Sequence, residues 1–176
     1  MTESSSTRPA TTPTPGTYRL DPDRSTFRVD AKGMFGLSPV HATMRLVSGE
    51  VTIADDPERS SVRAVIDARS FSSGNTKRDA DVTSANLLDA QTYPEITFSG
   101  EGARAQGNNW VVRGAVTAHG TSVPTDLTID DARTEDGTGR FHATATLDRT
   151  QFGVTKMKGM VGRRVKVIID AVAVPG

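Results

Sequence analysis

The stretch "RFHATATLD", Arg140 to Asp148, alternates strictly between apolar and polar residues. Its apolar positions are Phe141, Ala143, Ala145 and Leu147, which are spaced two residues apart. In a β-strand, successive side chains point to opposite faces, so this period places all four on one face. His142, Thr144 and Thr146 would then lie on the other face, in water. The stretch therefore predicts a strand of an antiparallel sheet with one buried and one solvated side.

The same period recurs along most of the chain, and no long stretch shows a convincing helical period. The clearest further strands are "STFRVDA" (25–31), "SVRAVIDA" (61–68) and "VKVIIDAVAV" (165–174), and shorter ones are "MRLVSGEVTI" (44–53), "EITFSGEG" (95–102), "NWVVRGAVTA" (109–118) and "TDLTID" (125–130). Turn signals are expected at Ser48-Gly49, at Asp55-Asp56-Pro57, at 106–109 and at 135–137. About eight short, evenly spaced strands predict an all-β protein, closed into a barrel.

The composition limits the class of protein. The chain has 176 residues, which suits one domain, with 21 basic and 21 acidic residues and no cysteine. A net charge of zero argues against nucleic acid as a partner, and the lack of cysteine excludes disulfides and thiolate metal sites. No segment has the roughly 18 apolar residues that span a bilayer, so stable membrane insertion is not expected.

The first residues, "MTESSSTRPATTPTPG", are rich in Thr, Ser and Pro. We expect residues 1–16 to form a disordered tail and residues 17–174 to form the folded domain. The tail has no apolar run of the kind found in a secretory signal, which predicts a cytoplasmic protein. A mature secreted chain without its leader would have the same sequence.

One segment departs from the alternating pattern. "TKRDADVTSANLLDAQTYPEITFSG", residues 76–100, begins charged and then becomes apolar at Leu87 and Leu88. We expect it to lie at the mouth of the barrel, with Leu87, Leu88 and Tyr93 against the interior. Pro94 would hold Tyr93 extended. A brief helix is expected over 84–90, with Thr83 or Ser84 as its N-cap.

These residues also carry a resemblance. The matching stretches are "YRLDPDRSTFRV" (18–29), "FGLSPVHATMRLVSGEV" (35–51), the segment 76–100, "VRGAVTAHGTSVPTDLTI" (112–129) and "LDRTQFGV" (147–154). The most distinctive pieces are Arg78-Asp79 and the Tyr-Pro-x-Ile-x-Phe run that begins at Tyr93. Over 17–174 the chain resembles the YceI family of polyisoprenoid-binding, lipocalin-like proteins.

The resemblance implies an eight-stranded antiparallel lipocalin-like barrel with a short helix or irregular segment at its mouth. It further implies a long apolar cavity that holds a polyisoprenoid or a similar long-chain amphiphile. The chain differs from the family at two places. Leu87 and Leu88 replace two phenylalanines, and the run Ala42-Thr43-Met44 replaces Gly-Thr-Phe. Fewer rings and more flexible aliphatic side chains indicate that the ligand differs from the family's usual one.

The expected function is binding, sequestration or transport of such a ligand. The residues expected to contact it are Phe27, Phe35, Met44, Arg78, Leu87, Leu88, Tyr93, Phe98, Phe152 and Met157. Spacing alone is equally typical of an ordinary barrel core, and the resemblance favours a ligand-binding cavity. Arg78 could pair with a headgroup, whereas Asp79 is expected to fix the loop. The basic stretch 152–164 could gate the cavity, contact an anionic headgroup or a membrane surface, or form a solvated turn.

Two other functions stay open. An enzyme of the cyclase or isomerase type could use the same cavity, with Asp30, Asp148 or a histidine as its acid or base, although no known catalytic motif occurs. An interaction domain would instead have a filled interior and an exposed apolar patch. His41, His119 and His142 lack the spacing of metal ligands, so no metal and no cofactor are expected. A homodimer is compatible with all three functions.

Overall fold

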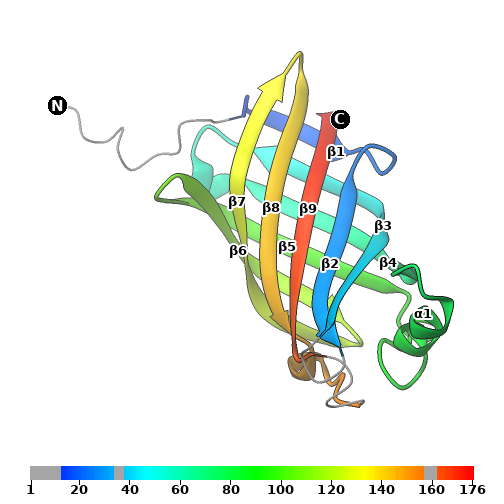
Figure 1. Cartoon of the computed structure of the whole chain (residues 1–176). Helices are drawn as coiled ribbons and strands as arrows, with labels where there is room; N and C mark the ends of the chain where they lie inside the picture. Colours follow the sequence, from blue (N-terminus) through cyan, green and yellow to red (C-terminus); the bar gives the residue numbers. More distant parts are fainter. Residues whose placement is uncertain (1–12, 34–37, 157–161) are drawn as a thin grey trace.

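The computed structural model describes residues 13–33, 38–156 and 162–176, whose strands form one sheet that closes on itself (Figure 1). The strands are β1 (Gly16–Leu20), β2 (Thr26–Gly33), β3 (Ser38–Ile53), β4 (Ser61–Ser72), β5 (Glu95–Gln106), β6 (Asn109–Ala118), β7 (Thr121–Glu135), β8 (Thr138–Asp148) and β9 (Arg164–Pro175). Between them lie the helix α1 (Thr76–Thr83) and two 3₁₀ turns, η2 (Pro57–Arg59) and η3 (Arg149–Phe152). None of these described helices is long and apolar enough to cross a membrane.

The barrel has eight strand positions. Neighbours around it follow the order β3-β2-β9-β8-β7-β6-β5-β4, and pairing of β3 with β4 closes the ring. Every pairing is antiparallel. β1 pairs with β3 and β9, the same two strands that flank β2. β1 and β2 therefore occupy one strand position of the barrel, one after the other. The prediction of an eight-stranded antiparallel lipocalin-like barrel is confirmed.

The break between β1 and β2 is held by polar groups. The Asp21 backbone N–H donates to the Val172 carbonyl of β9 at 2.7 Å. The Val172 N–H in turn donates to the Ser25 hydroxyl at 3.0 Å, and that hydroxyl lies 3.3 Å from the Val172 carbonyl oxygen. These bonds replace the strand pairing that the break interrupts, so the ring stays closed at this point.

Tight turns join the long strands. Asp136 and Gly137 both have positive φ, 52° and 79°, between β7 and β8. His119 and Gly120 have φ of 53° and 74° between β6 and β7. Positive φ at both central residues is what a two-residue type I′ hairpin needs. The turn expected at 135–137 is therefore confirmed.

The turn expected at Ser48-Gly49 is wrong, because both residues lie inside β3. The register between β3 and β4 shifts between Leu46 and Ser48, which marks a β-bulge. Gly49 is required there because a Cβ would collide with the side chain of Leu20. A glycine that admits a neighbour's side chain looks the same in sequence as one that makes a turn.

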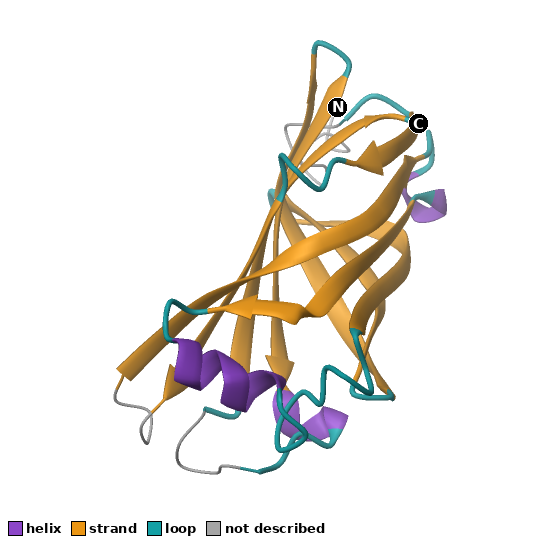
Figure 2. Ribbon diagram, turned by 90° about the vertical axis from the view of Figure 1, so that its right-hand side faces the viewer, coloured by secondary structure: helices purple, strands orange, loops and turns teal. Residues whose placement is uncertain are grey.

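The helix expected over 84–90 is also wrong. α1 precedes it, and the Asn75 side chain caps its start by accepting from the Arg78 N–H at 3.0 Å. Ser84 lies at the other end, where its hydroxyl donates to the Asp81 carbonyl at 2.6 Å. The apolar clump follows the helix as a series of turns, in which Leu87 is buried. α1 itself has no buried residue and crosses the lower end of the barrel (Figure 2).

The predicted tail falls partly outside the described residues, which begin at Pro13. Pro13 is buried, and the Thr14 N–H donates to the Thr134 hydroxyl at 2.9 Å. The Tyr18 hydroxyl donates to the Thr14 carbonyl at 2.6 Å. β1 then begins at Gly16, one residue before the boundary expected from composition.

We expect Gly114→Ala to lower the free energy of unfolding by about 1–3 kcal/mol, because overpacking a tight site forces its neighbours to shift. Gly114 pairs with Gly100 across β6 and β5, and the ring of Phe98 lies over both. A Cβ on Gly114 would lie 2.7 Å from Phe98 Cζ and closer still to a backbone carbonyl oxygen. Urea denaturation measures the loss. Ala115→Val, on the outer face of the same strand, is the control and should stay within about 0.5 kcal/mol. Equal losses would contradict the packing argument.

Candidate functional site

The interior of the barrel holds two adjacent chambers. The upper chamber, toward β1 in Figure 1, has a volume of about 360 Å³, and the lower chamber, toward α1, has about 510 Å³. Both volumes lie in the range of known small-molecule sites, about 300–1,000 Å³. The walls are mainly aliphatic side chains that point inward from alternate strand positions. Such walls can take up an apolar ligand but offer few groups for chemistry.

A ring of side chains separates the two chambers. Five residues line both of them: Phe27, Ile96, Val116, Leu147 and Val167. They come from five different strands, β2, β5, β6, β8 and β9, so they surround the passage from several sides. We call this set the waist. Any ligand that occupies both chambers must pass it.

The upper chamber is lined by small and aliphatic residues. The alanines among them are Ala54, Ala64, Ala103, Ala132, Ala143, Ala145 and Ala171. Trp110, which is 7 % exposed, also lines this chamber, and its indole Nε1 has no hydrogen-bond acceptor among the described residues. Asp55 is the one ionisable side chain in the described lining, and its residue is exposed at the rim. The upper chamber is therefore apolar apart from this rim.

The lower chamber carries charge on one side. α1 contributes Lys77, Arg78, Asp81 and Val82 to its lining, and the turns after α1 contribute Leu87 and Leu88. Lys77 is exposed and Arg78 is half-buried, so both cations can meet water and a ligand at the same time. The Asp79 carboxylate instead accepts from the Ser73 N–H at 3.0 Å and from the Ser73 hydroxyl at 2.6 Å. As expected, Asp79 fixes the loop.

Arg149 holds the floor of the lower chamber. Its side chain is buried and lines the chamber, and its Nη1 donates to the Val154 carbonyl at 2.6 Å and to the Lys156 carbonyl at 3.1 Å. Its Nε donates to the Gly162 carbonyl at 3.0 Å. Burial lowers the pKa of the guanidinium from its usual value. The fork of donors ties three backbone carbonyls of the basic stretch 152–164 to η3.

Next to it, Asp148 serves the surface and not the cavity. Its carboxylate accepts from the Thr150 hydroxyl and N–H, and it pairs with Arg163 at 3.1 Å. The Thr150 hydroxyl is the main cause that holds the pKa of Asp148 below its usual value.

Asp30 likewise faces outward, with its carboxylate 2.8 Å from His41 Nδ1. The hydrogen bond with His41 is the main cause that lowers the pKa of Asp30. Neither carboxylate lines a chamber.

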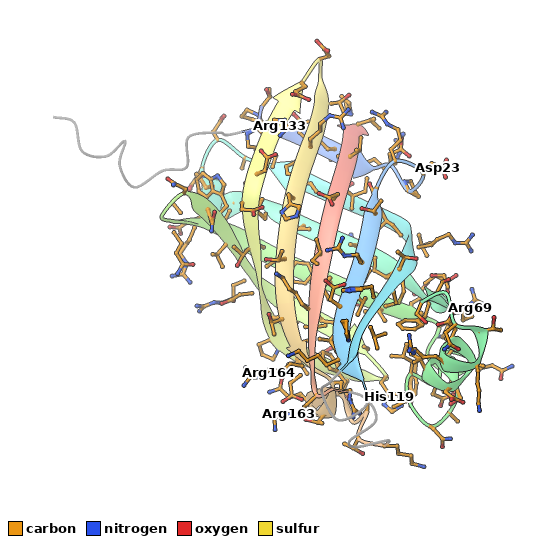
Figure 3. All side chains as sticks on the ribbon, viewed as in Figure 1. Asp23, Arg69, His119, Arg133, Arg163 and Arg164 are labelled. Carbon is orange, nitrogen blue, oxygen red and sulfur yellow. The ribbon has the colours of Figure 1, made fainter. Side chains whose placement is uncertain are left out.

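Packed rings cover one side of the lower end. The centroids of the Tyr93 and His119 rings are 5.0 Å apart, and His119 Nδ1 lies 3.1 Å from the Phe152 carbonyl oxygen. Gly120 leaves room for Tyr93, because a Cβ there would lie 2.9 Å from the Tyr93 ring. Figure 3 shows His119 at this end together with Arg163 and Arg164. Tyr93 therefore packs against the β6–β7 turn and lines neither chamber.

The other predicted contact residues divide between the chambers. Met44, Arg78, Leu87, Leu88 and Phe152 line the lower chamber, Phe98 lines the upper one, and Phe27 lines both. Phe35 and Met157 lie outside the described residues. Sequence reasoning missed Trp110, Ile96, Val116 and Leu147 as lining residues, although their alternation in β5, β6 and β8 marked them as inward. It also missed Arg149, which no pattern distinguishes from the other surface-type arginines.

The described lining residues contain no histidine, and their two carboxylates, Asp55 and Asp81, belong to exposed residues. His142 lies on the outer face, with Nδ1 2.6 Å from Asp130. Within 13–33, 38–156 and 162–176, no three side chains of His, Asp or Glu come together as a metal site would require. The geometry favours binding of an apolar chain over acid–base chemistry in the chambers.

We expect Arg149→Lys to lower the free energy of unfolding by about 1–3 kcal/mol, because one ammonium cannot replace the fork and leaves a buried carbonyl without a donor. Urea denaturation at neutral pH measures the change. Arg163→Lys is the control: Arg163 is exposed and its surface ion pair should contribute no more than about 1 kcal/mol. An Arg149→Lys protein as stable as the Arg163→Lys protein would refute the structural role of Arg149.

The chain is similar to several known proteins over most of its length. It is 27 % identical over 149 residues to a UPF0312 protein of Pseudomonas savastanoi pv. phaseolicola, covering 78 % of this chain and 76 % of that one. It is 24 % identical over 142 residues to protein YceI of Salmonella arizonae, covering 77 % and 74 %.

Among solved structures, BcnA of Burkholderia cenocepacia matches with a TM-score of 0.74 at 23 % identity, over 87 % of this chain and 98 % of that one. A polyisoprenoid binding domain from Saccharophagus degradans matches with a TM-score of 0.64 at 14 % identity, over 90 % and 98 %. These likenesses show the fold. A family model, the YceI-like domain, matches residues 18–173. With eight antiparallel strands around a double chamber and a family match over nearly all of its length, the chain belongs to the YceI-like family.

Proposed function

We propose that this protein binds one long-chain amphiphile, a polyisoprenoid or a lipid of similar shape, and carries or sequesters it inside the barrel. The observation that carries the proposal is the pair of adjacent, mainly apolar chambers, about 360 and 510 Å³. The name of the Saccharophagus degradans domain, a polyisoprenoid binding domain, supports a ligand of this class. The ligand contacts are proposed to include Phe27, Met44, Leu87, Phe98 and Phe152.

The energetics favour a chain over a compact ligand. Each methylene moved from water into such walls contributes about 0.8 kcal/mol. Association itself costs about 4–15 kcal/mol, so a ligand needs many buried carbons to bind tightly. A chain that fills both chambers offers them, whereas a small polar molecule would bury few carbons against these mainly apolar walls.

The polar end of the ligand is assigned to the lower chamber, beside α1. Lys77 and Arg78 are the cations in its described lining that are open to water. A carboxylate or phosphate placed there could pair with Arg78 without losing all of its hydration. The departures from the family at Leu87, Leu88 and Met44 fall in this same chamber. If the ligand differs from the family's usual one, we therefore expect the difference to lie in its polar end.

The direct test is native mass spectrometry of the full chain, followed by organic extraction and identification of the released compound. We expect one molar equivalent of a long-chain species. A protein that is empty after gentle purification, and that also fails to bind long-chain probes added at micromolar concentration, would refute the proposal.

We expect Arg78→Ala to weaken binding of eicosenoate about 3- to 10-fold, since a hydrogen bond to a charged group contributes more than a neutral one but is partly screened here. Binding of the uncharged eicosenol should change less than about twofold, because an alcohol carries no charge with which Arg78 could pair. Titration against a displaced fluorescent probe measures both. Arg69→Ala is the control, because Arg69 is exposed, pairs with Asp67 and lines neither chamber. Equal losses for acid and alcohol would contradict the assignment of the polar end.

A further inference from the structure

The waist divides the cavity into two parts of different chemistry. Lys77, Arg78, Asp81 and Arg149 line only the lower chamber. In the described lining of the upper chamber, Asp55 is the one charged side chain, and it is an anion at the rim. A polar or anionic group is thus favoured below the waist and disfavoured above it. An amphiphile that enters from the lower chamber must therefore lead with its apolar end.

The waist is also more uniformly apolar than either chamber. Its five members are one aromatic and four branched aliphatic side chains, and none of them is polar. Val167 is buried, and Val116, which pairs with Phe98 of β5, is buried as well. Phe27, Ile96 and Leu147 are half-buried, so the waist consists of two buried and three partly open side chains. A slender apolar chain meets no polar group there, whereas a headgroup would lose its hydration without a partner.

We infer that the waist is a gauge of chain length: a short amphiphile occupies the lower chamber alone, whereas a long one threads its tail past the waist into the upper chamber and buries more apolar surface. This rests on the proposed function, and it names the ligand class more closely. The preferred ligand is an amphiphile with a slender apolar tail and its polar group at the α1 end. Discrimination against short chains comes from the upper chamber, and access to that chamber is set by Phe27, Val116 and Val167.

The chain contains its own reporter. Trp110 is the single tryptophan of the protein and lines the upper chamber but not the lower one. It lies on β6 with Val116, and at a rise of about 3.4 Å per strand residue the two are roughly 20 Å apart along the strand. A ligand confined to the lower chamber leaves the surroundings of Trp110 unchanged. A tail above the waist changes them.

The experiment titrates the full chain with octanoate and with eicosenoate, and follows both binding, by calorimetry, and Trp110 emission. In the unmodified protein, both probes should bind, eicosenoate more tightly by about tenfold or more, since each further buried methylene adds to affinity. Only eicosenoate should shift the emission of Trp110. Val116→Phe and Val167→Phe each narrow the waist, and each should abolish the emission shift. The affinity for eicosenoate should fall to within about threefold of the affinity for octanoate, because the tail then gains nothing from the upper chamber. Val116 and Val167 also line the lower chamber, so the readout is the ratio of the two affinities within each variant and not the affinity for octanoate alone.

Val47→Phe is the matched control, because Val47 is exposed on the outer side of β3. Two independent waist variants guard against the loss of one to misfolding, which circular dichroism detects. The inference is overturned if octanoate shifts Trp110 as eicosenoate does, or if a folded waist variant keeps the full eicosenoate response. If neither probe binds to the unmodified protein, the proposed function fails instead, so the two failures are distinguishable.

Discussion

The interior of an eight-stranded barrel is only just wide enough to be filled by side chains, and the size of the inward residues decides whether it is a core or a container. In this protein, alanine occupies many inward positions around the upper half, including Ala143 and Ala145 of β8 and Ala171 of β9. A leucine or phenylalanine at those places would fill the space. The chambers thus depend on small residues as much as on the closure of the sheet.

The same constraint explains where large side chains are tolerated. Phe98 lies inward, but its ring covers Gly100 and Gly114, which have no side chains of their own. Gly49 makes room for Leu20 in the same way on β3. These bulky groups are thus matched with glycines on their own or a neighbouring strand, and the volume of the cavity is preserved. Phe27 stands at the waist instead and divides the space.

The two ends of the barrel are finished by different means. At the upper end, the strands themselves and the segment from Pro13 to β1 provide the cover, and Thr14 is bonded to β7. At the lower end, the 3₁₀ turn η3, the buried Arg149 and the Tyr93–His119 contact close most of the opening. α1 lies beside this end and has no buried residue. A helix without buried residues therefore borders the charged chamber.

Much of this arrangement is local in the sequence and was predictable. Alternation in "RFHATATLD" and its counterparts specifies strands, and Asp-Gly at 136–137 specifies a hairpin turn. The errors arise where one signal has two causes. Ser48-Gly49 resembles a turn but accommodates a neighbour, and the clump at Leu87 resembles a helix face but is a turn that buries one leucine. The waist was not predictable, because its five residues meet only through the register of five strands. Nor could the buried Arg149 be distinguished from the surface arginines. Its burial depends on hydrogen bonds to carbonyl oxygens later in the chain, among them that of Gly162.

Adaptability and rigidity are distributed unevenly along the cavity, and this bears on how one barrel can serve different ligands. Met44, Leu87 and Leu88 surround the lower chamber, and methionine and leucine can adjust to headgroups of different shape. The described lining of the upper chamber has no methionine and consists mainly of alanines and β-branched residues, whose side chains have little freedom to move. Under the proposed function, a change of headgroup would be absorbed near α1 by a few substitutions among these residues. A change in tail length would instead require substitutions at several inward positions of the strands. The alanines and β-branched side chains above the waist cannot change the volume of the upper chamber by adopting other rotamers.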